Sequence, residues 1–471
     1  MTAISTLVPS ETAYIAKLVD KQRKYFATGA TKDVSFRINQ LKKLRAAIVA
    51  NERVFLDALY KDLRKCDTEG YLTEIGFVLN DLDEAINYTK KWAKPQQVST
   101  PLFHVKASSH IHSEPYGNVL VIAPWNYPFQ LLLAPMVGAM SAGNTVIVKP
   151  SEFAAHTSKA LSKLIADTFS EEYIASVEGA VPETQALLSE KFDYVFFTGS
   201  TEVGRIVYQA AAKHLTPVTL ELGGKSPCII DEKTHIEYSA KRIISGKLMN
   251  CGQTCIAPDY LLIHQNVKNK MVAEMKKQIT SFYSENPQES NDYGRIINKK
   301  HFNRLKNLLD SGDIIHGGQT DEDDLYIAPT LLDNVGKDEP VMQEEIFGPI
   351  LPILTYSRIE DAIQFVNDRA KPLALYMFSK SQKNIDKVMN ETSAGGVSIN
   401  DTLMHIANPN LPFGGVGESG IGAYHGKYSF DTFSHKKSVL HKSFIIDAPV
   451  RYAPFEKNEK LLRVMLKYLN K

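Results

Sequence analysis

No charged residue occurs between Glu114 and Lys149, and this long neutral stretch restricts the fold more than any other feature of the chain. A membrane-spanning helix needs about 20 continuous, mainly apolar residues. Proline, glycine and asparagine residues interrupt the stretch from position 124 onward, which argues against a single spanning helix. The pattern instead predicts a buried strand at 119–123, a turn at PWNYP, a helix at about 129–142 and a second strand at 145–148. We therefore expect a βαβ unit.

Similar units follow along the chain. A helical stretch begins after Ser151, a short strand is expected near 176–178, and the apolar run at 194–197 ends at Gly199. The sequence GSTEVGRIVYQAAAKH then has apolar residues at helical spacing, and VTLELGG is a further apolar strand that ends in glycines. Strands that alternate with helices form a parallel sheet, and such sheets bind ligands at the carboxyl ends of their strands.

The flanking segments have different patterns. Residues before 98 are mainly helical, and we expect them to cover the sheet rather than to carry chemistry. A second alternating α/β region begins after Cys255. In KASSHIHSEPYG and in the tail after Lys437, polar and apolar residues alternate as they do in strands. Both segments lie outside the βαβ units, which favours strands at an interface.

Composition limits the class of protein. The 471 residues suffice for two or three domains of about 150 residues. Lys and Arg total 54 against 53 for Asp and Glu, so the net charge of +1 provides no broad basic surface for nucleic acid. Four cysteines are too few for a disulfide framework and form no Cys-x-x-Cys pair, so we predict a reducing compartment and no metal site. Because no apolar signal core precedes Lys17, we expect a cytoplasmic protein whose mature chain starts near Met1.

Two cysteines, Cys251 and Cys255, lie in NCGQTCIAP at the junction of the two α/β regions. An arbitrary cysteine is more often a small buried apolar residue than a reactive one. At this junction, however, Cys255 could face an interdomain cleft where backbone donors favour the thiolate. Both interpretations stay open from these residues alone.

Two polar residues occupy unusual positions. Glu221 ends the apolar strand VTLELGG, where a carboxylate is costly unless it is solvated, paired or functional. Asn126 lies in the PWNYP turn, where its amide either caps the turn or donates to a developing oxyanion. The glycines of GSTEVG mark either a tight turn or a ligand loop, and GGKS lacks the first glycine of a phosphate-binding loop, because Thr219 holds that position.

Several specific motifs occur in one order: PWNYP, KPSE, FTGSTEVG, LELGGKSP, GQTC, EEIFGP and PFGGVGESG. Through them the chain resembles the aldehyde dehydrogenase superfamily from about residue 15 to residue 440. The sequences GQTCIAPDY and GIGAYHGKYSFDTFSHKK look most like the class 3 branch, which includes fatty and aromatic aldehyde dehydrogenases.

The resemblance implies catalytic roles for three residues. Cys255 is the expected nucleophile, Asn126 and the Cys255 backbone N–H are the expected oxyanion donors, and Glu221 is the expected general base. Cys251 receives no role.

The resemblance also implies a dinucleotide site. Lys149 and Glu152 of KPSE would face the adenine ribose, and Gly199 and Ser200 the pyrophosphate. The remaining expected cofactor residues are Trp125, Glu345 and Phe347, the last two facing the nicotinamide ribose and ring. The expected cofactor is NAD, with NADP as a second one.

The implied activity is the oxidation of aldehydes, medium- to long-chain or aromatic, to carboxylic acids through a cysteine thioester. Relatives that pass the acyl group to coenzyme A tend to lack the glutamate that this chain has at Glu221, so hydrolysis is favoured. A structural, lens-type binding protein is the non-enzymatic alternative, and such a protein would be expected to have lost Cys255.

The implied fold is α/β, with a Rossmann-like cofactor domain, an α/β catalytic domain and a small β oligomerisation arm. We expect the cofactor domain at 1–98 and 117–219 and the catalytic domain at 220–412. The arm and C-terminal tail are expected at 99–116 and 413–471, and the family implies a homodimer.

The end of the tail, NEKLLRVMLKYLNK, predicts a basic amphipathic helix with Leu461, Leu462, Met465, Tyr468 and Leu469 on one face. Docking against the body or the dimer partner is one interpretation of this helix. A lid over the substrate tunnel or a weak membrane-surface contact is the alternative.

Overall fold

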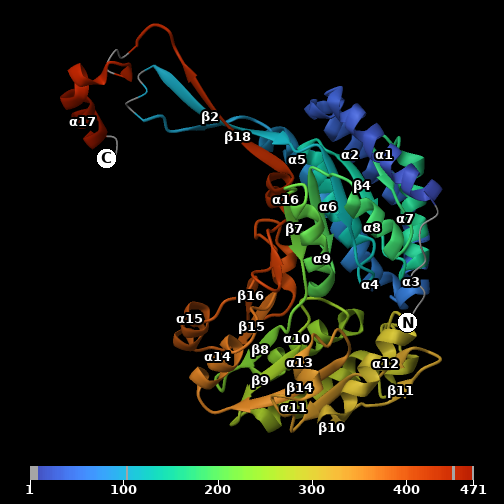
Figure 1. The fold of residues 1–471 in the computed structure, drawn as a ribbon. Helices are drawn as coiled ribbons and strands as arrows, with labels where there is room; N and C mark the ends of the chain where they lie inside the picture. Colours follow the sequence, from blue (N-terminus) through green and yellow to red (C-terminus); the bar gives the residue numbers. More distant parts are fainter. Residues whose placement is uncertain (1–8, 102–103, 105, 448–450, 469–471) are drawn as a thin grey trace.

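The computed structural model describes residues 9–101, 104, 106–447 and 451–468, which form two large sheets with their helices and a thin projecting arm (Figure 1). The first sheet has the strand order β17-β7-β6-β3-β4-β5. Its strands are β3 (Asn118–Ile122), β4 (Thr145–Lys149), β5 (Ile174–Ser176), β6 (Tyr194–Thr198), β7 (Val218–Glu221) and β17 (Gly420–Ile421). All are parallel except β17, which runs antiparallel to β7. The predicted βαβ order is confirmed, with the predicted strands displaced by no more than three residues at either end.

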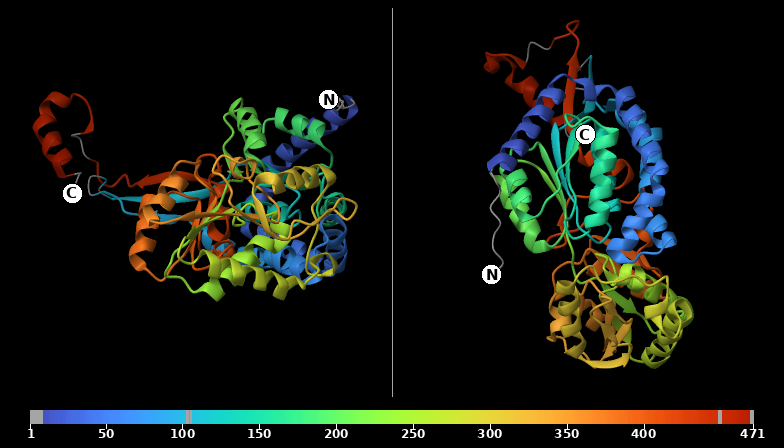
Figure 2. Two further views of the ribbon diagram at one scale, coloured as in Figure 1. Left: turned by 90° about the horizontal axis from the view of Figure 1, so that it is seen from below. Right: turned by 90° about the vertical axis from the view of Figure 1, so that its right-hand side faces the viewer.

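Helices cover this sheet on both faces (Figure 2). The helix α6 (Gln130–Ala142) connects β3 to β4, and every one of its residues is buried, which explains why the neutral stretch needs no charge. The other helices that follow strands of this sheet are α7 (Ala155–Thr168), α8 (Val181–Ser189) and α9 (Thr201–Ala212). The N-terminal helical elements are α1 (Pro9–Ala27), η1 (Ala30–Lys32), α2 (Val34–Ala50), α3 (Glu52–Leu63), α4 (Asp67–Gly70), the π-helical segment η2 (Tyr71–Ile75) and α5 (Gly76–Trp92).

The helix α2 shows how the sequence produces the helices that pack on this sheet. Asp33 caps its N-terminus by accepting the Ser35 backbone N–H at 3.1 Å. Leu41, Leu44 and Ile48 follow at three- and four-residue spacing and are fully buried, so the apolar stripe of the helix faces the core.

The second sheet has the order β10-β13-β14-β9-β8-β15-β16 and is parallel except for the edge pair β10 and β13. Its strands are β8 (Pro227–Ile230), β9 (Tyr260–His264), β10 (Asp313–His316), β13 (Thr330–Asp333), β14 (Ile350–Tyr356), β15 (Ala374–Phe378) and β16 (Gly396–Ile399). The associated helices are α10 (Ile236–Leu248), η3 (Met249–Gly252), α11 (Lys268–Tyr283), η4 (Pro287–Glu289), α12 (Lys299–Leu308), η5 (Leu309–Ser311), α13 (Pro340–Gln343), α14 (Ile359–Asn367), α15 (Gln382–Glu391) and η6 (Met404–Ala407). A small hairpin joins β11 (Thr320–Asp321) to β12 (Tyr326–Ile327).

The arm is a three-stranded antiparallel sheet of β1 (Gln96–Val98), β2 (Ala107–Pro115) and β18 (Ser434–Lys442). It extends away from both domains, and η8 (Phe455–Asn458) and α17 (Glu459–Tyr468) follow it at its far end (Figure 1). The predicted amphipathic helix at the end of the chain therefore forms, although Leu469 and Lys471 lie outside the described residues.

The structure differs from the expected domain boundaries in three places. The boundary at 219/220 falls inside β7, which belongs wholly to the first sheet because its ladder with β6 continues to Glu221. The strand β17 and the helix α16 (Gly426–Thr432) pack on the first domain rather than in the arm. Conversely, β1 pairs with β2 and so belongs to the arm. Within the described residues, no helix is long and apolar enough to cross a bilayer.

Candidate active site

A cavity of about 840 Å³ lies where the first and second sheets meet. Its walls contain most of the residues predicted from the motifs, although these come from distant parts of the sequence. The predicted residues in the wall are Trp125, Asn126, Gly199, Ser200, Glu221, Cys255, Glu345 and Phe347. The structure thus gathers eight of the ten predicted site residues at one place.

The first sheet supplies four of these residues from the carboxyl ends of three adjacent strands. Asn126 follows β3, Gly199 and Ser200 follow β6, and Glu221 is the last residue of β7. The Gly199 backbone N–H donates to the Glu221 carbonyl at 3.0 Å, which fixes the loop after β6 against β7. This is the edge at which parallel sheets bind ligands.

Gly199 and Ser200 open the twelve-residue helix α9. Ser200 caps the helix, because its hydroxyl accepts the Val203 backbone N–H at 3.3 Å. A Cβ atom on Gly199 would lie 2.5 Å from the Phe197 ring, so a side chain there would force that ring to move. The first residues of α9 line the cavity, so the N-terminus of the helix faces it. The backbone N–H groups at a helix N-terminus are suited to bind an anion.

Cys255 reaches the cavity through an unusual backbone turn after α10. Asn250, Cys251 and Gly252 have φ values of 53°, 52° and 73°, in the left-handed region that side-chain-bearing residues rarely adopt. A Cβ atom on Gly252 would lie 2.3 Å from the Gly348 carbonyl oxygen, so only glycine fits there. The turn leaves Cys251 buried and Cys255 half-buried at the cavity wall.

Burial raises the pKa of the Cys255 thiol, and the charges of Glu345 and Glu221 raise it further. The backbone N–H groups of Cys255 and Ile256 act in the opposite direction. The predicted backbone donors are therefore present, but burial outweighs them and favours the protonated thiol. Attack by Cys255 on a substrate therefore requires the loss of the thiol proton.

Glu221 is buried, with only 3% of its surface exposed. Both of its carboxylate oxygens are buried without a hydrogen-bond partner. This burial raises the pKa of Glu221 well above its usual range. An unpaired carboxyl group in a cavity is a functional-site feature, because a merely structural carboxylate is paired or solvated.

The second domain supplies Glu345 and Phe347. The Phe347 ring lies edge-on to the Trp125 indole, with ring centroids 5.3 Å apart. Burial raises the pKa of Glu345 to about 8, and its Oε1 atom has no partner. A Cβ atom on Gly223 would lie 2.0 Å from Glu345 Oε2, so the absence of a side chain at Gly223 leaves room for this carboxyl group.

These features fit a dinucleotide. The α9 N-terminus is suited to phosphates, and the unpartnered Glu345 oxygen is suited to a ribose hydroxyl. In the part of the chain that the structure describes, no group of three or more His, Cys, Asp or Glu residues could hold a metal ion.

Lys149 and Glu152 are the two predicted residues that do not line this cavity. Lys149 is buried at the end of β4, donates to the Pro150 carbonyl at 2.7 Å and lies 3.7 Å from the Glu152 carboxylate. Both still lie at the carboxyl edge of the first sheet, because β4 pairs in register with β3.

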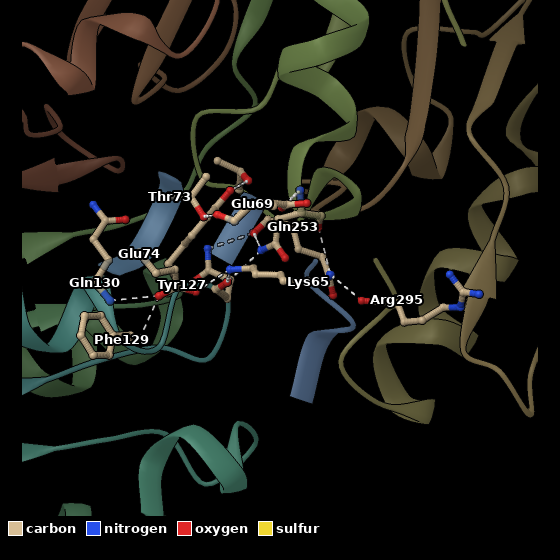
Figure 3. A network of polar contacts seen from close by, with 12 residues as sticks. Lys65, Glu69, Thr73, Glu74, Tyr127, Phe129, Gln130, Gln253 and Arg295 are labelled. Atoms are coloured by element: carbon tan, nitrogen blue, oxygen red, sulfur yellow. Dashed lines mark hydrogen bonds and ion pairs between the residues drawn. The ribbon is translucent and has the colours of Figure 1, made fainter. Parts of the chain in front are cut away.

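Sequence reasoning missed two groups of residues. Basic side chains also line the cavity: Lys225, Arg304, Lys337, Arg369 and Lys371. In addition, the segment between α3 and α5, expected only to cover the sheet, sends Lys65, Glu69 and Glu74 into the loops that carry Asn126 and Cys255 (Figure 3). A charged residue in an amphipathic helical region resembles a surface residue, so no sequence signal distinguished these three.

Comparison with known proteins identifies a family. Residues 2–439 match the model of the aldehyde dehydrogenase family. The chain is 52% identical to 4,4'-diaponeurosporen-aldehyde dehydrogenase of Staphylococcus aureus, over 94% of this chain and 97% of that protein. It is 49% identical to the dimeric NADP-preferring aldehyde dehydrogenase of Rattus norvegicus, over 93% and 98% respectively. The substrate-bound structure of Staphylococcus aureus AldH superimposes with a TM-score of 0.95 at 51% identity, covering 96% of this chain and 99% of that one.

Proposed function

Since this chain belongs to the aldehyde dehydrogenase family and to its class 3 branch, we propose that Cys255, Asn126 and Glu221 carry its reaction. The chain is an NAD(P)-dependent enzyme that oxidises aldehydes to carboxylic acids. The observation that carries the assignment of residues is their convergence. The thiol and the amide come from two separate loops and the unpaired carboxyl group from the end of β7, and all three line one cavity.

In the first half-reaction, the Cys255 thiol loses its proton to solvent and the thiolate sulfur attacks the aldehyde carbon, so that negative charge develops on the carbonyl oxygen. The Asn126 side-chain amide and the Cys255 backbone N–H are the donors for that charge. Removing one such donor typically costs about 3 to 4 kcal/mol of transition-state stabilisation. When bound, NAD(P)+ is the oxidant that accepts two electrons as a hydride. The acyl group remains on Cys255 as a thioester.

In the second half-reaction, Glu221 takes a proton from a water molecule that attacks the thioester carbon. The bond between that carbon and the Cys255 sulfur breaks, and the thiolate and the free acid result. General-base catalysis of this kind contributes about 10² to 10⁴ in rate. Coenzyme A is the alternative acceptor, and the retained Glu221 argues for water.

The proposed substrates are medium- to long-chain aliphatic or aromatic aldehydes. One supporting observation is that the Staphylococcus aureus relative is named for 4,4'-diaponeurosporen-aldehyde. A second is another cavity of about 910 Å³, whose wall combines the apolar side chains of Phe77, Trp92 and Ile406 with charged ones that include Asp81 and Lys427. Burial raises the pKa of the Tyr424 phenol, next to His425, and the charges of Glu221, Cys255 and Asp81 raise it further. We propose that the aldehyde chain occupies this second cavity.

NAD is the proposed preferred cofactor, with NADP as a second one. The support comes from Glu152, whose carboxylate would accept hydrogen bonds from ribose hydroxyls and repel a 2′-phosphate. The rat relative is named as NADP-preferring, and the adjacent Lys149 offers a partial countercharge.

A homodimer held by the arm is the proposed assembly. The arm and the segment after it expose large apolar side chains, with Phe444 and Ile445 exposed by 105% and 83%. The rat relative is named as dimeric. We further propose a cytoplasmic protein whose α17 docks on the partner, with a weak contact to a membrane surface as the alternative for this basic helix.

A panel of aldehydes tests the proposed function. Reduction of NAD+ or NADP+ should accompany oxidation of straight-chain and aromatic aldehydes, with kcat/KM rising with chain length. The product should be the free acid even when coenzyme A is present. Formation of acyl-coenzyme A would contradict the assignment of Glu221, and a falling kcat/KM with chain length would contradict the proposed substrate class.

A further inference from the structure

Lys65 and Glu74 form an ion pair whose two side chains are both completely buried. The Lys65 Nζ atom lies 2.5 Å from Glu74 Oε1, and neither side chain has any exposed surface. Removing two charges from water is expensive, so a buried pair is weak evidence for stability by itself. The role of the pair is therefore inferred from the backbone groups to which Lys65 and Glu74 are hydrogen-bonded.

Glu74 holds the start of α6. Its Oε2 atom accepts the backbone N–H groups of Phe129 and Gln130, each at 3.0 Å (Figure 3). Glu74 lies in the π-helical segment η2, and π-helical turns occur frequently at functional sites. The carboxylate thereby fixes the end of the turn that contains Asn126.

Lys65 holds the same turn from the other side. Its ammonium group donates to the backbone carbonyl of Asn126 at 2.9 Å and lies 3.9 Å from the centre of the Tyr127 ring. The Asn250 side-chain amide donates to the same Asn126 carbonyl at 2.8 Å and to the Gln253 carbonyl at 3.1 Å. One carbonyl thus connects the buried pair to the loop that carries Cys255.

The side chain of Asn126 completes this connection. Its Nδ2 atom donates to the Gln253 carbonyl at 3.0 Å. An amide nitrogen carries two hydrogens. One hydrogen of Asn126 Nδ2 bonds to the loop that carries Cys255, and this bond fixes the direction in which the second hydrogen points. Both the backbone and the side chain of Asn126 are therefore fixed by this network.

We propose that Lys65 and Glu74 are positioning residues that hold the Asn126 amide in place to donate to the substrate oxyanion. The proposal rests on the role given to Asn126 under the proposed function. The pair touches neither substrate nor cofactor and acts through the Asn126 turn. A misplacement of about 1 Å in such a donor can cost about 10² in rate.

The decisive variant is the neutral pair Lys65→Met with Glu74→Gln, which leaves no uncompensated buried charge. The introduced glutamine keeps an acceptor for the backbone N–H groups of Phe129 and Gln130, whereas the introduced methionine cannot donate to the Asn126 carbonyl. The matched control is Lys268→Met with Asp333→Asn, which removes a half-buried 2.7 Å ion pair between α11 and β13. If the neutral pair does not fold, Lys65→Met alone removes the donor to the Asn126 carbonyl and leaves Glu74 to accept the backbone N–H groups of Phe129 and Gln130.

Three readouts separate positioning from general stability. The pre-steady-state burst of reduced cofactor needs the oxyanion donor, and we expect it to slow about 10- to 100-fold. Alkylation of Cys255 by iodoacetamide forms no oxyanion, and we expect its rate to stay within about threefold of wild type. The KM for NAD+ should also stay unchanged. The control pair should leave the burst rate unchanged while lowering Tm.

A double-mutant cycle with Asn126→Ala shows whether the pair acts through Asn126. In that background the neutral pair should slow the burst by less than about threefold further. The inference is overturned if the burst keeps its wild-type rate in the neutral pair, or if the neutral pair slows the Asn126→Ala enzyme as strongly as it slows wild type. A normal burst in Asn126→Ala itself would instead refute the role of Asn126 in the proposed function.

Discussion

Asn126 donates a side-chain hydrogen bond to the backbone carbonyl of Gln253, two residues before Cys255, at 3.0 Å. The bond crosses from the first domain to the loop that leads into the second. The separation between the amide and the thiol therefore depends on direct contacts between two loops, which include this bond and the bond from the Asn250 amide to the Asn126 carbonyl. Both loops are held by further buried bonds.

The first prediction concerns this amide. Asn126→Ala should lower the burst rate of cofactor reduction by about 10² to 10³, because it removes one oxyanion donor. The dissociation constant for NAD+ should stay unchanged, since Asn126 acts on the aldehyde oxygen. Stopped-flow measurement of the burst checks the rate, and a variant with the wild-type burst would show that Asn126 only caps its turn.

The second prediction concerns pH. Burial raises the pKa of Glu221 well above its usual range, so the ionised form that can accept a proton increases as the pH rises. Hydrolysis of the acyl-enzyme should accelerate about tenfold per pH unit below that pKa. Decay of the acyl-enzyme between about pH 6 and about pH 9, followed by quenched mass spectrometry, measures this slope. A pH-independent decay would mean that Glu221 is not the base.

The third prediction concerns the choice of cofactor. The wild-type enzyme should have a higher kcat/KM for NAD+ than for NADP+, because the Glu152 carboxylate repels a 2′-phosphate. Glu152→Gln should raise kcat/KM for NADP+ relative to NAD+, and Glu190→Gln, with the same change in charge, should not. A wild-type preference for NADP+ would refute the role of Glu152.

The fourth prediction concerns the C-terminal helix. Leu461 and Val464 of α17 are about half exposed in the single chain, at 54% and 52%, which suits a helix that docks on a partner. Deletion of residues 457–471 should weaken the dimer and lower Tm, and it should affect KM for short and long aldehydes alike. A selective increase of KM for long aldehydes would show a lid instead, and loss of liposome binding would show a membrane contact.

The sequence predicts those parts of this fold that depend on local patterns. The strands β3, β4 and β6 are short apolar runs bounded by glycine, proline or polar residues, and such runs are recognisable without a structure. Part of the cavity wall is predictable for the same reason, because Asn126, Gly199 and Glu221 lie at or just after the ends of these predicted parallel strands.

Long-range contacts were not predictable. The strand β17 has two residues and pairs with β7 about 200 positions away, so no local pattern marks it. Lys65 is equally hidden, since its burial results from the meeting of η2, the Asn126 turn and the Asn250 loop. Each of these contacts needs the assembled tertiary structure.

The central claim is that Cys255 carries an acyl thioester that Glu221 helps to hydrolyse. Peptide mass spectrometry of Glu221→Gln, quenched after one burst of cofactor reduction, tests it most directly. We predict the acyl mass on the peptide that contains Cys255, no such mass and no burst after Cys255→Ala, and most of the wild-type turnover in Cys251→Ala. Unmodified Cys255 after a full burst in Glu221→Gln, or robust turnover in Cys255→Ala, would contradict the account.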